Sequence, residues 1–277
     1  MNLGVRDRVA LVTGGSQGIG RAIAIALARE GARVGVTYRT NQEKADAVAA
    51  GIRDEGSDAV ALPLELSSDD SISAAVDALV KRWGRVDILV LNAVQWASHR
   101  VGRAPAFEDL ARDEWRALLR SNIEGSYAIT QAVLPYMRQR GWGRMVTISS
   151  IVAHDGMRGV AWYATVKSAM HGLTRSLASE VGSDGILVNV VMAGPTLSDR
   201  TRSVVPPAAL DGYARLSPIR RLLTPDDLAA TVAFLCSAAN TSITGEVIRV
   251  SGGLRMPSQS LSSAVAPEAA ALTATHR

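Results

Sequence analysis

The sequence predicts a single-domain, doubly wound α/β fold with about seven parallel strands and helices on both faces of the sheet. Short runs of Val, Ile and Leu alternate with longer, Ala-rich stretches whose apolar residues recur at helical spacing. The short runs are apolar at nearly every position, which is typical of strands covered on both faces. The 277 residues contain no internal repeat and no polar linker, so we predict one domain over residues 1–256.

The predicted elements alternate along the chain. Apolar, β-branched runs predict strands at residues 8–13, 33–38, 58–63, 86–92, 143–150, 186–191 and 246–250. Helical patterns lie between them at residues 18–30, 41–55, 69–83, 113–139, 162–181 and 225–238. Such alternation predicts crossover helices and therefore a parallel sheet.

Two segments depart from this alternation. Residues 195–224 are long and rich in Pro and Arg, and we expect them to form a functional lid. Residues 257–277 are poor in bulky side chains, so we expect a mobile C-terminal tail.

The composition narrows the class of protein. Hydrophobic residues make up 47% and charged residues 20% of the chain, with a net charge of +4. The Arg residues are spread along the sequence, which argues against nucleic-acid binding. No apolar run approaches the ~18 residues of a membrane span, and the N-terminus lacks a signal-peptide pattern. Cys236 is the only cysteine, so no internal disulfide forms, and we expect a cytoplasmic protein with no membrane partner.

A glycine-rich turn follows the first strand. The sequence TGGSQGIG (residues 13–20) leads directly into a helix. Gly14, Gly18 and Gly20 let the backbone approach a ligand, and the helix N-terminus offers free N–H groups to a phosphate. A glycine triple alone is equally consistent with a plain tight turn. Its place between a strand and a helix predicts a dinucleotide-binding, Rossmann-type unit.

A Tyr–Lys pair marks the second functional segment. In WYATVKSAM (residues 162–170), Tyr163 and Lys167 are four residues apart, which places them on one face of a helix. Ser150 ends the strand before this helix, and Asn122 lies in the long helical window before that strand. These four residues are our candidates for catalysis.

Together these motifs resemble the classical short-chain dehydrogenase/reductase (SDR) family, and more closely its ketoreductases and 3-oxoacyl-[acyl-carrier-protein] reductases. The resemblance covers residues 5–253 and rests on Thr13–Gly20, Asn122, Ser150, Tyr163 and Lys167. It implies an oxidoreductase acting on CH–OH or C=O groups (EC 1.1.1.-). By that resemblance, Lys167 also holds the nicotinamide ribose, and Asn122 anchors a water in the proton relay.

The chemistry of ketone reduction fits these residue types. The developing alkoxide needs a proton, and a tyrosine has an ordinary pKa of about 10. A neighbouring cation favours the phenolate, so we expect Lys167 and an oxidised nicotinamide to lower the pKa of Tyr163. Tyr163 is then the general acid for reduction and the general base for oxidation. Ser150 is expected to hydrogen-bond the substrate oxygen.

Several of these residues also have structural interpretations. Ser150 could cap the turn after its strand, and Asn122 could hydrogen-bond the backbone of a kinked helix. A nicotinamide-sensing regulatory protein could retain the fold without turnover, although it would be free to lose the four candidate residues. An alcohol dehydrogenase or an isomerase of the same family is a further alternative.

The end of the second strand points to NADP(H). Tyr38 takes the position where an NAD-binding protein carries an acid, and Arg39 follows it; an Arg there suits a 2′-phosphate. A solvated Arg at a strand end is the alternative. The predicted NADPH/NADP⁺ site comprises Gly14, Ser16, Gln17, Gly18, Ile19, Gly20, Tyr38, Arg39, Thr40, Glu65, Leu66, Asn92, Ala93, Tyr163, Lys167, Gly194, Thr196 and Ser198.

Four positions differ from the family pattern. Val94 replaces a glycine after the fourth strand, and Glu65 replaces an Asp that contacts adenine. Ala193 stands where a Pro is usual, and Ser198 stands for a Thr near the carboxamide. None of these changes removes a group that does chemistry.

The predicted substrate is a small-molecule ketone that is bulky and aromatic, of the kind found in polyketide biosynthesis. We expect it to contact Val94, Trp96, Ser150, Val152, Met157, Trp162, Tyr163, Met192 and Val204. The lid adds Val205, Pro206, Pro207, Tyr213 and Leu216 as apolar surface. His99 and His154 have no partner at ligand spacing, so no metal is predicted.

The main alternative substrate is an acyl chain on an acidic carrier protein. The resembling reductases carry arginines at two positions that are Gly141 and Asp184 here. Arg138, Arg140 and Arg144 lie close to the first position and could substitute. Small and apolar residues on several faces of the helices at 113–139 and 162–181 predict a homotetramer or a homodimer.

Overall fold

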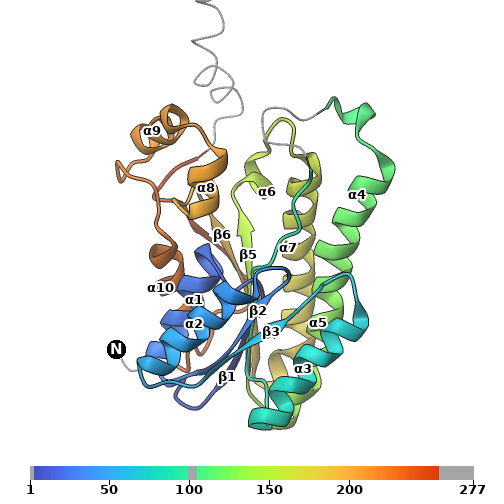
Figure 1. The fold of residues 1–277 in the computed structure, drawn as a ribbon, viewed down its shortest axis with the longest axis vertical. Helices are drawn as coiled ribbons and strands as arrows, with labels where there is room; N and C mark the ends of the chain where they lie inside the picture. The colour runs from blue at the N-terminus through green and yellow to red at the C-terminus, as the bar shows by residue number, and fades with distance from the viewer. Residues whose placement is uncertain (1–2, 99–104, 256–277) are drawn as a thin grey trace, which may run out of the picture.

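The computed structural model describes residues 3–98 and 105–255, and its described part contains one parallel sheet of seven strands (Figure 1). The strands lie in the order β3-β2-β1-β4-β5-β6-β7. Their bounds are β1 Val9–Val12, β2 Arg33–Tyr38, β3 Ala59–Pro63, β4 Ile88–Leu91, β5 Gly143–Ser150, β6 Ile186–Ala193 and β7 Val247–Val250. The predicted doubly wound Rossmann-type fold is confirmed, and each predicted strand is present to within two residues of its expected start or end.

Two layers of helices cover the sheet (Figure 1). One face packs against α1 (Gly18–Arg29), α2 (Gln42–Asp54) and α10 (Pro225–Leu235), which bury residues such as Leu27, Ile52 and Val232. The other face packs against α3 (Asp69–Trp83), α5 (Gly125–Arg140) and α7 (Ala161–Val181). Cys236, at the end of α10, is fully buried in the first of these cores.

The long helix predicted at 113–139 is interrupted. The structure has α4 (Arg112–Leu119), then a π-helical turn (Arg120–Glu124), then α5. The π turn contains Asn122, and such turns are common at functional sites. A side chain at Gly125 would lie 2.1 Å from the carbonyl oxygen of Leu66, so α5 can start here only with a glycine.

The segment predicted as a lid contains two short helices rather than an irregular loop. These are α8 (Asp199–Val204) and α9 (Pro207–Leu216). The two ends of the segment pair with each other, because Thr196 and Leu223 form a parallel bridge. A further short helix, α6 (Val152–Asp155), follows β5 directly and was not expected from the sequence.

The predicted C-terminal tail lies outside the described residues, as does His99. Within the part that the structure describes, no helix is both long and apolar enough to cross a membrane.

Candidate active site

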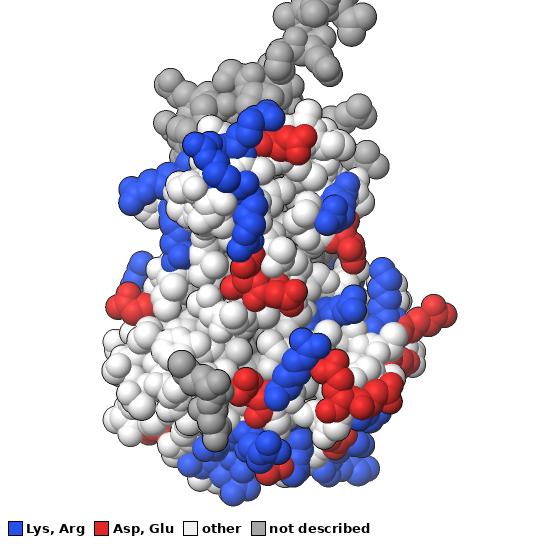
Figure 2. Space-filling view, turned by 90° about the vertical axis from the view of Figure 1, so that its left-hand side faces the viewer, with Lys and Arg blue, Asp and Glu red and all other residues white. Residues whose placement is uncertain are grey.

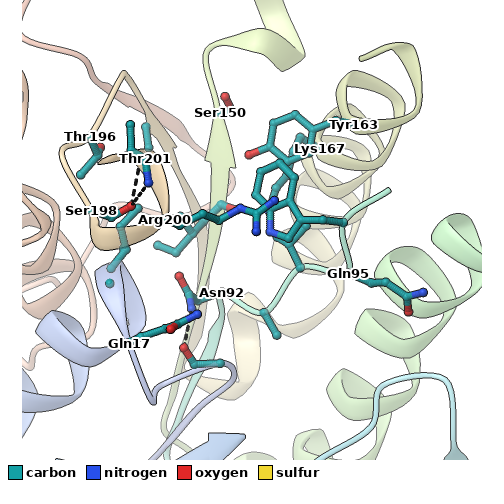
Figure 3. Close-up of a pocket in the computed structure, with 18 of the residues that line it drawn as sticks. Gln17, Asn92, Gln95, Ser150, Tyr163, Lys167, Thr196, Ser198, Arg200 and Thr201 are labelled. Atoms are coloured by element: carbon teal, nitrogen blue, oxygen red, sulfur yellow. Dashed lines mark hydrogen bonds between the residues drawn. The ribbon is translucent and has the colours of Figure 1, made fainter. Parts of the chain in front are cut away.

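A cavity of about 790 Å³ runs along the carboxyl-terminal edge of the sheet (Figure 3). Ligands of open α/β sheets bind at this edge, where the strand order reverses between β1 and β4. The glycine turn lies at one part of the cavity wall, and Ser150, Tyr163 and Lys167 lie at another. The fold therefore brings the two predicted motifs to one cavity.

The glycine turn is shaped by close backbone approaches. Gly14 and Gly18 have φ angles of +64° and +55°, which favour glycine. A side chain at Gly20 would lie 2.3 Å from the carbonyl oxygen of Gly14 and 2.5 Å from Nδ2 of Asn92. Gly20 is therefore a packing residue that brings α1 against the turn, and it does not line the cavity.

Thr13 and Asn92 connect the ends of β1 and β4. Nδ2 of Asn92 donates to the carbonyl oxygens of Thr13 (2.9 Å) and Gly14 (3.1 Å). Oγ1 of Thr13 accepts hydrogen bonds from the backbone N–H groups of Asn92 and Ala93. On the other side, the N–H of Gly14 donates to Oγ1 of Thr37. The backbone around the glycine turn is thus held on both sides in the shape that a dinucleotide needs.

The end of β2 carries a cation and no acid. Arg39 lies at the cavity wall, half exposed, with Nε 3.9 Å from Oε2 of Glu65. The other carboxylate oxygen of Glu65 accepts hydrogen bonds from the N–H and hydroxyl of Ser67. These contacts leave the guanidinium of Arg39 beside the cavity with one long ion pair.

The catalytic candidates are positioned by contacts between α7 and β5. Nζ of Lys167 donates to the carbonyl oxygen of Ile148 at 2.7 Å. The hydroxyl of Ser149 lies 2.7 Å from Nε2 of His171, one turn further along α7. These contacts fix the register of the helix against the strand that ends at Ser150. The face of α7 that carries Tyr163 and Lys167 therefore lines the cavity.

Burial controls the electrostatics of this pair. It raises the pKa of Tyr163 to about 12, and a hydrogen bond with Ser150 and the charge of Arg200 act in the opposite direction. Burial lowers the pKa of Lys167 to about 8. In the protein alone, the loss of hydration outweighs the nearby charges. The lowering expected from Lys167 together with a bound oxidised nicotinamide stays a prediction.

Asn122 does not reach the cavity wall. Its Oδ1 accepts from the N–H of Gln95 at 2.9 Å, and its Nδ2 donates to the carbonyl oxygens of Gln95 and Leu118. The side chain therefore ties the loop after β4 to the π turn. These contacts agree with the structural interpretation given above, and the role of Asn122 in the proton relay stays a prediction.

Three aromatic rings form the wall around Tyr163. Trp96 stacks on Tyr163 with ring centroids 5.0 Å apart and an angle of 21° between the planes. Trp162 meets both rings edge-on, at 6.0 Å from Trp96 and 5.5 Å from Tyr163. Cζ of Arg200 lies 4.1 Å from the ring centroid of Trp96. Figure 3 shows Arg200 extending toward Tyr163.

Most of the predicted site residues line this cavity, and a few do not. All the predicted cofactor residues except Gly20 line it, as do Val94, Trp96, Val152, Met157, Trp162 and Val204. The side chain of Met192 is only 5% exposed and packs in a small cluster with Ile151 and Leu254. It does not line the cavity, so its assignment to the substrate pocket is wrong. Of the lid residues, Val205 and Tyr213 reach the cavity, whereas Pro206, Pro207 and Leu216 do not.

The sequence interpretation missed Arg200. Its position, two residues after a predicted cofactor contact at Ser198, was the available signal. It had been treated only as one of several arginines in the lid. The spacing could not show that this side chain turns inward onto Trp96, because the two residues are far apart in the chain.

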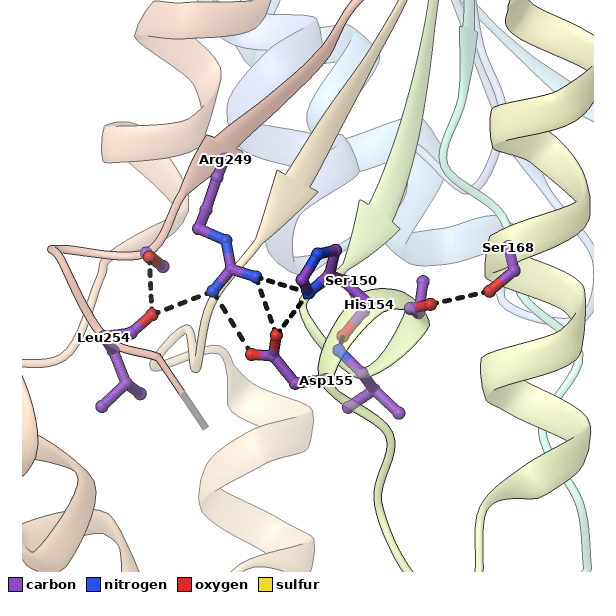
Figure 4. A network of polar contacts seen from close by, with 9 residues as sticks. Ser150, His154, Asp155, Ser168, Arg249 and Leu254 are labelled. Atoms are coloured by element: carbon purple, nitrogen blue, oxygen red, sulfur yellow. Dashed lines mark hydrogen bonds and ion pairs between the residues drawn. The ribbon is translucent and has the colours of Figure 1, made fainter. Parts of the chain in front are cut away.

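An ion pair fastens the helix that follows Ser150 (Figure 4). Asp155, at the end of α6, lies 2.8 Å from NH2 of Arg249 on β7 and 2.8 Å from Nδ1 of His154. Arg249 also donates to the carbonyl oxygen of Leu254. His154 thus belongs to this network. Among the described residues, no group of three His, Cys, Asp or Glu could hold a metal ion.

The chain is similar to known oxidoreductases over nearly its whole length. A family model described as enoyl-(acyl carrier protein) reductase matches residues 14–255. A 3-oxoacyl-[acyl-carrier-protein] reductase of Staphylococcus aureus is 36% identical over 247 residues, which cover 89% of this chain and 98% of the relative. The corresponding reductase of Aquifex aeolicus is 37% identical over 255 residues, covering 92% and 100%.

A solved structure gives the same result at the level of the fold. A 7α-hydroxysteroid dehydrogenase complexed with NADH and 7-oxo glycochenodeoxycholic acid has a TM-score of 0.84 and 34% sequence identity, covering 91% of this chain and 96% of that one. The glycines of the turn leave room for a ligand to approach the backbone, which fits a nicotinamide dinucleotide such as the one bound to that protein. The chain therefore belongs to the classical short-chain dehydrogenase/reductase family and is a ketoreductase-like oxidoreductase that acts on CH–OH or C=O groups with a nicotinamide cofactor.

Proposed function

We propose that this protein is an NADPH-dependent ketoreductase that reduces a bulky, aromatic ketone of the polyketide type to a secondary alcohol. The observation that carries the proposal is the shared cavity. Ser150, Tyr163 and Lys167 line one part of it, and Arg39 lines the part beside the end of β2. A single extended ligand, the cofactor, can therefore reach from the cation to the proton donor.

The protonation state of Tyr163 supports the reductive direction. With a pKa raised to about 12, the phenol keeps its proton near neutral pH and can donate it to the ketone oxygen. Ser150 holds that oxygen by a hydrogen bond beside the Tyr163 hydroxyl. The bound NADPH supplies the hydride. Oxidation of an alcohol would instead need the phenolate, which the positive nicotinamide of a bound oxidised cofactor would favour.

Arg39 supports the preference for NADPH. The end of β2 lacks the carboxylate that usually accepts the two ribose hydroxyls of NAD. The ion pair of Arg39 with Glu65 is long and solvent-exposed, and such pairs contribute little. A 2′-phosphate can therefore replace it as a stronger partner.

A second candidate function is the reduction of a 3-oxoacyl chain on a carrier protein, which the names of the curated relatives favour. Two of the arginines near Gly141 already have partners. Arg138 pairs with Asp184 at 2.9 Å, and Arg144 is buried and donates to backbone carbonyl groups. Both lie toward the amino-terminal end of β5, at the opposite edge of the sheet from the cavity of the same chain.

Relative rates distinguish the two candidates. The oxidation of NADPH would be followed by absorbance with free bicyclic and polycyclic ketones and with a carrier-bound 3-oxoacyl thioester. We expect a higher kcat/KM with at least one free ring ketone. Faster reduction of the carrier-bound thioester than of every ring ketone would favour the second function.

We also propose that the protein assembles as a homotetramer or a homodimer through α4, α5 and α7. Tyr127 on α5 supports this proposal, because 45% of this large side chain is exposed in the single chain. Light scattering at micromolar concentration should give at least twice the mass of one chain. A monomeric mass would contradict it.

A further inference from the structure

The charges that line the cavity are unbalanced. Among the described residues, its wall carries three cations, Arg39, Lys167 and Arg200, and one carboxylate, Glu65. Glu65 pairs with Arg39, and Nζ of Lys167 donates to the Ile148 carbonyl oxygen. Arg200 has no carboxylate partner in the described part of the chain.

Arg200 contacts the ring of Trp96. Its Cζ lies 4.1 Å from the ring centroid, within the range of a cation–π interaction. Such a contact uses none of the five N–H donors of the guanidinium. None of them has a hydrogen-bond acceptor among the residues described. The exposed guanidinium therefore presents at the cavity a fork of donors that no group of the described chain accepts.

The position of the fork is set relative to the reacting centre. Trp96 also stacks on Tyr163, and its backbone neighbour Gln95 is tied to Asn122 by two hydrogen bonds. The guanidinium is thus no farther from the Tyr163 ring than two stacking distances. Arg200 and Tyr163 also influence each other's pKa through their charges.

A second donor without an acceptor lies in the same cluster. Nε1 of Trp162 is buried and has no hydrogen-bond partner, and the Trp162 side chain lines the cavity. Buried donors are almost always paired in a native protein. Trp162 Nε1 is enclosed, whereas the donors of the exposed Arg200 side chain are open to a ligand in the cavity. Arg200 is therefore the group that can bind an acceptor of a ligand.

We propose that Arg200, held by Trp96, binds a carboxylate on the ketone substrate, so that the preferred substrates are ring ketones that also carry an acid group. This inference rests on the proposed function and narrows its substrate class. A planar carboxylate matches the guanidinium fork and can be bound by two parallel hydrogen bonds. The flat ring of such a substrate fits the aromatic and apolar wall around Tyr163.

The pyrophosphate of the cofactor is the competing partner for Arg200. The glycine turn and the N-terminus of α1 already offer backbone N–H groups to a phosphate. Ser198, rather than Arg200, lies beside that turn, because a side chain at Gly18 would be 3.6 Å from Cβ of Ser198. Arg200 is directed away from it, toward the stack on Tyr163 (Figure 3). The geometry thus favours the substrate.

The test compares matched substrates. Isomers of 2-tetralone that carry a carboxylate on the second ring would be assayed beside their methyl esters and unsubstituted 2-tetralone, using wild type, Arg200→Gln and Arg200→Lys. The control is Arg202→Gln, since Arg202 lies on the same short helix, is exposed and does not line the cavity. Figure 2 shows Lys and Arg side chains spread over one face of the molecule, with Asp and Glu side chains among them.

We expect Arg200→Gln to lower kcat/KM for the best carboxylated ketone by roughly 10- to 100-fold, the usual effect of losing a charge-assisted pair. The esters and the affinity for NADPH should change less than about threefold. Arg200→Lys should retain part of the preference for the acid, and Arg202→Gln all of it.

Three other outcomes would overturn the inference. Equal losses with acids and esters at unchanged NADPH affinity would mean that Arg200 acts only on Tyr163. Equal losses with weakened NADPH binding would assign Arg200 to the cofactor. A wild-type enzyme that reduces the esters but shows no preference for any acid would contradict the inference and leave the proposed function intact.

Failure of the proposed function would look different. If no ketone in the panel were reduced, calorimetric titration of the acids into the protein with NADP⁺ would test the anion site directly. Binding that Arg200→Gln weakens at least tenfold would support the site without the activity. Absence of binding to both proteins would overturn it.

Discussion

The two halves of the cavity are built in different ways. Around the glycine turn, backbone groups and short polar side chains of β1, β2 and β4 are hydrogen-bonded to one another, as at Thr13, Thr37 and Asn92. Around Tyr163, the wall consists of aromatic and apolar side chains from α6, α7, the lid and the loop after β4. Two donors there, on Trp162 and Arg200, have no acceptor within the described chain.

The difference shows what each half recognises. A cofactor does not vary, so a site of fixed backbone geometry suits it. The substrate half obtains its shape from side chains on separate segments, which can change without disturbing the sheet. Substitutions should therefore separate cofactor binding from turnover.

The largest effect should come from Tyr163→Phe, which removes the proton donor and keeps the ring that stacks on Trp96. We expect kcat to fall by ~10³-fold, with the dissociation constant for NADPH within about twofold of wild type. Stopped-flow kinetics and fluorescence titration measure the two quantities. Retention of more than a few per cent of kcat would show that another group donates the proton.

Arg39→Ala tests the outer end of the cofactor half. Loss of a charge-assisted contact to the 2′-phosphate should weaken NADPH binding by roughly 10- to 100-fold. Binding of NADH should stay within about threefold, since it has no phosphate there. Fluorescence titration with both cofactors is the measurement, and an equal loss with both would make Arg39 a structural residue.

Gly20→Ala tests the packing under the glycine turn. A methyl group 2.3 Å from the Gly14 carbonyl oxygen must displace the turn, so we expect a loss of about 1–3 kcal/mol in the free energy of unfolding and weaker binding of NADPH. Urea denaturation and cofactor titration measure these effects.

The matched control is Gly51→Ala in α2, where an added methyl group meets nothing within 4 Å. We expect it to stabilise the helix by about 0.5–1 kcal/mol. Equal stability of the two variants would mean that the turn shifts without cost.

The smallest effect concerns pH and the buried Lys167. Its pKa is lowered from 10.5 to about 8, so between these two values the unfolded chain binds more protons than the folded chain. The contribution of Lys167 to stability therefore rises with pH across this window. As the pH increases from about 8 to 10, the free energy of unfolding of wild type should increase relative to that of Lys167→Met. A constant difference between the two proteins would contradict the lowered pKa.

The same division between the halves explains how much could be predicted from the sequence. The strand order follows from alternating elements, and the turn at Gly14–Gly20 has a spacing that depends on local backbone geometry. Ser150, Tyr163 and Lys167 could be predicted to share a site, because one ends a strand and the other two lie one turn apart on the next long helix.

The missed features depend on long-range contacts. Met192 is a residue type that is common in apolar pockets. Side chains alternate between the two faces along β6, and that of Met192 packs with Ile151 and Leu254 instead of lining the cavity. The π turn at Asn122 lies beside a close approach of α5 to Leu66, which no local pattern contains. Arg200 depends on Trp96, about a hundred positions earlier in the sequence.

The pairing of Thr196 with Leu223 has an evolutionary consequence. Because the lid leaves the body of the protein and rejoins it at neighbouring points, the length between them can change at a small entropic cost, which grows only slowly with loop length. The segment is thus an exchangeable cassette. Recombination that swaps it between relatives would transfer a substrate preference in one event while every residue that holds the cofactor turn stays in place.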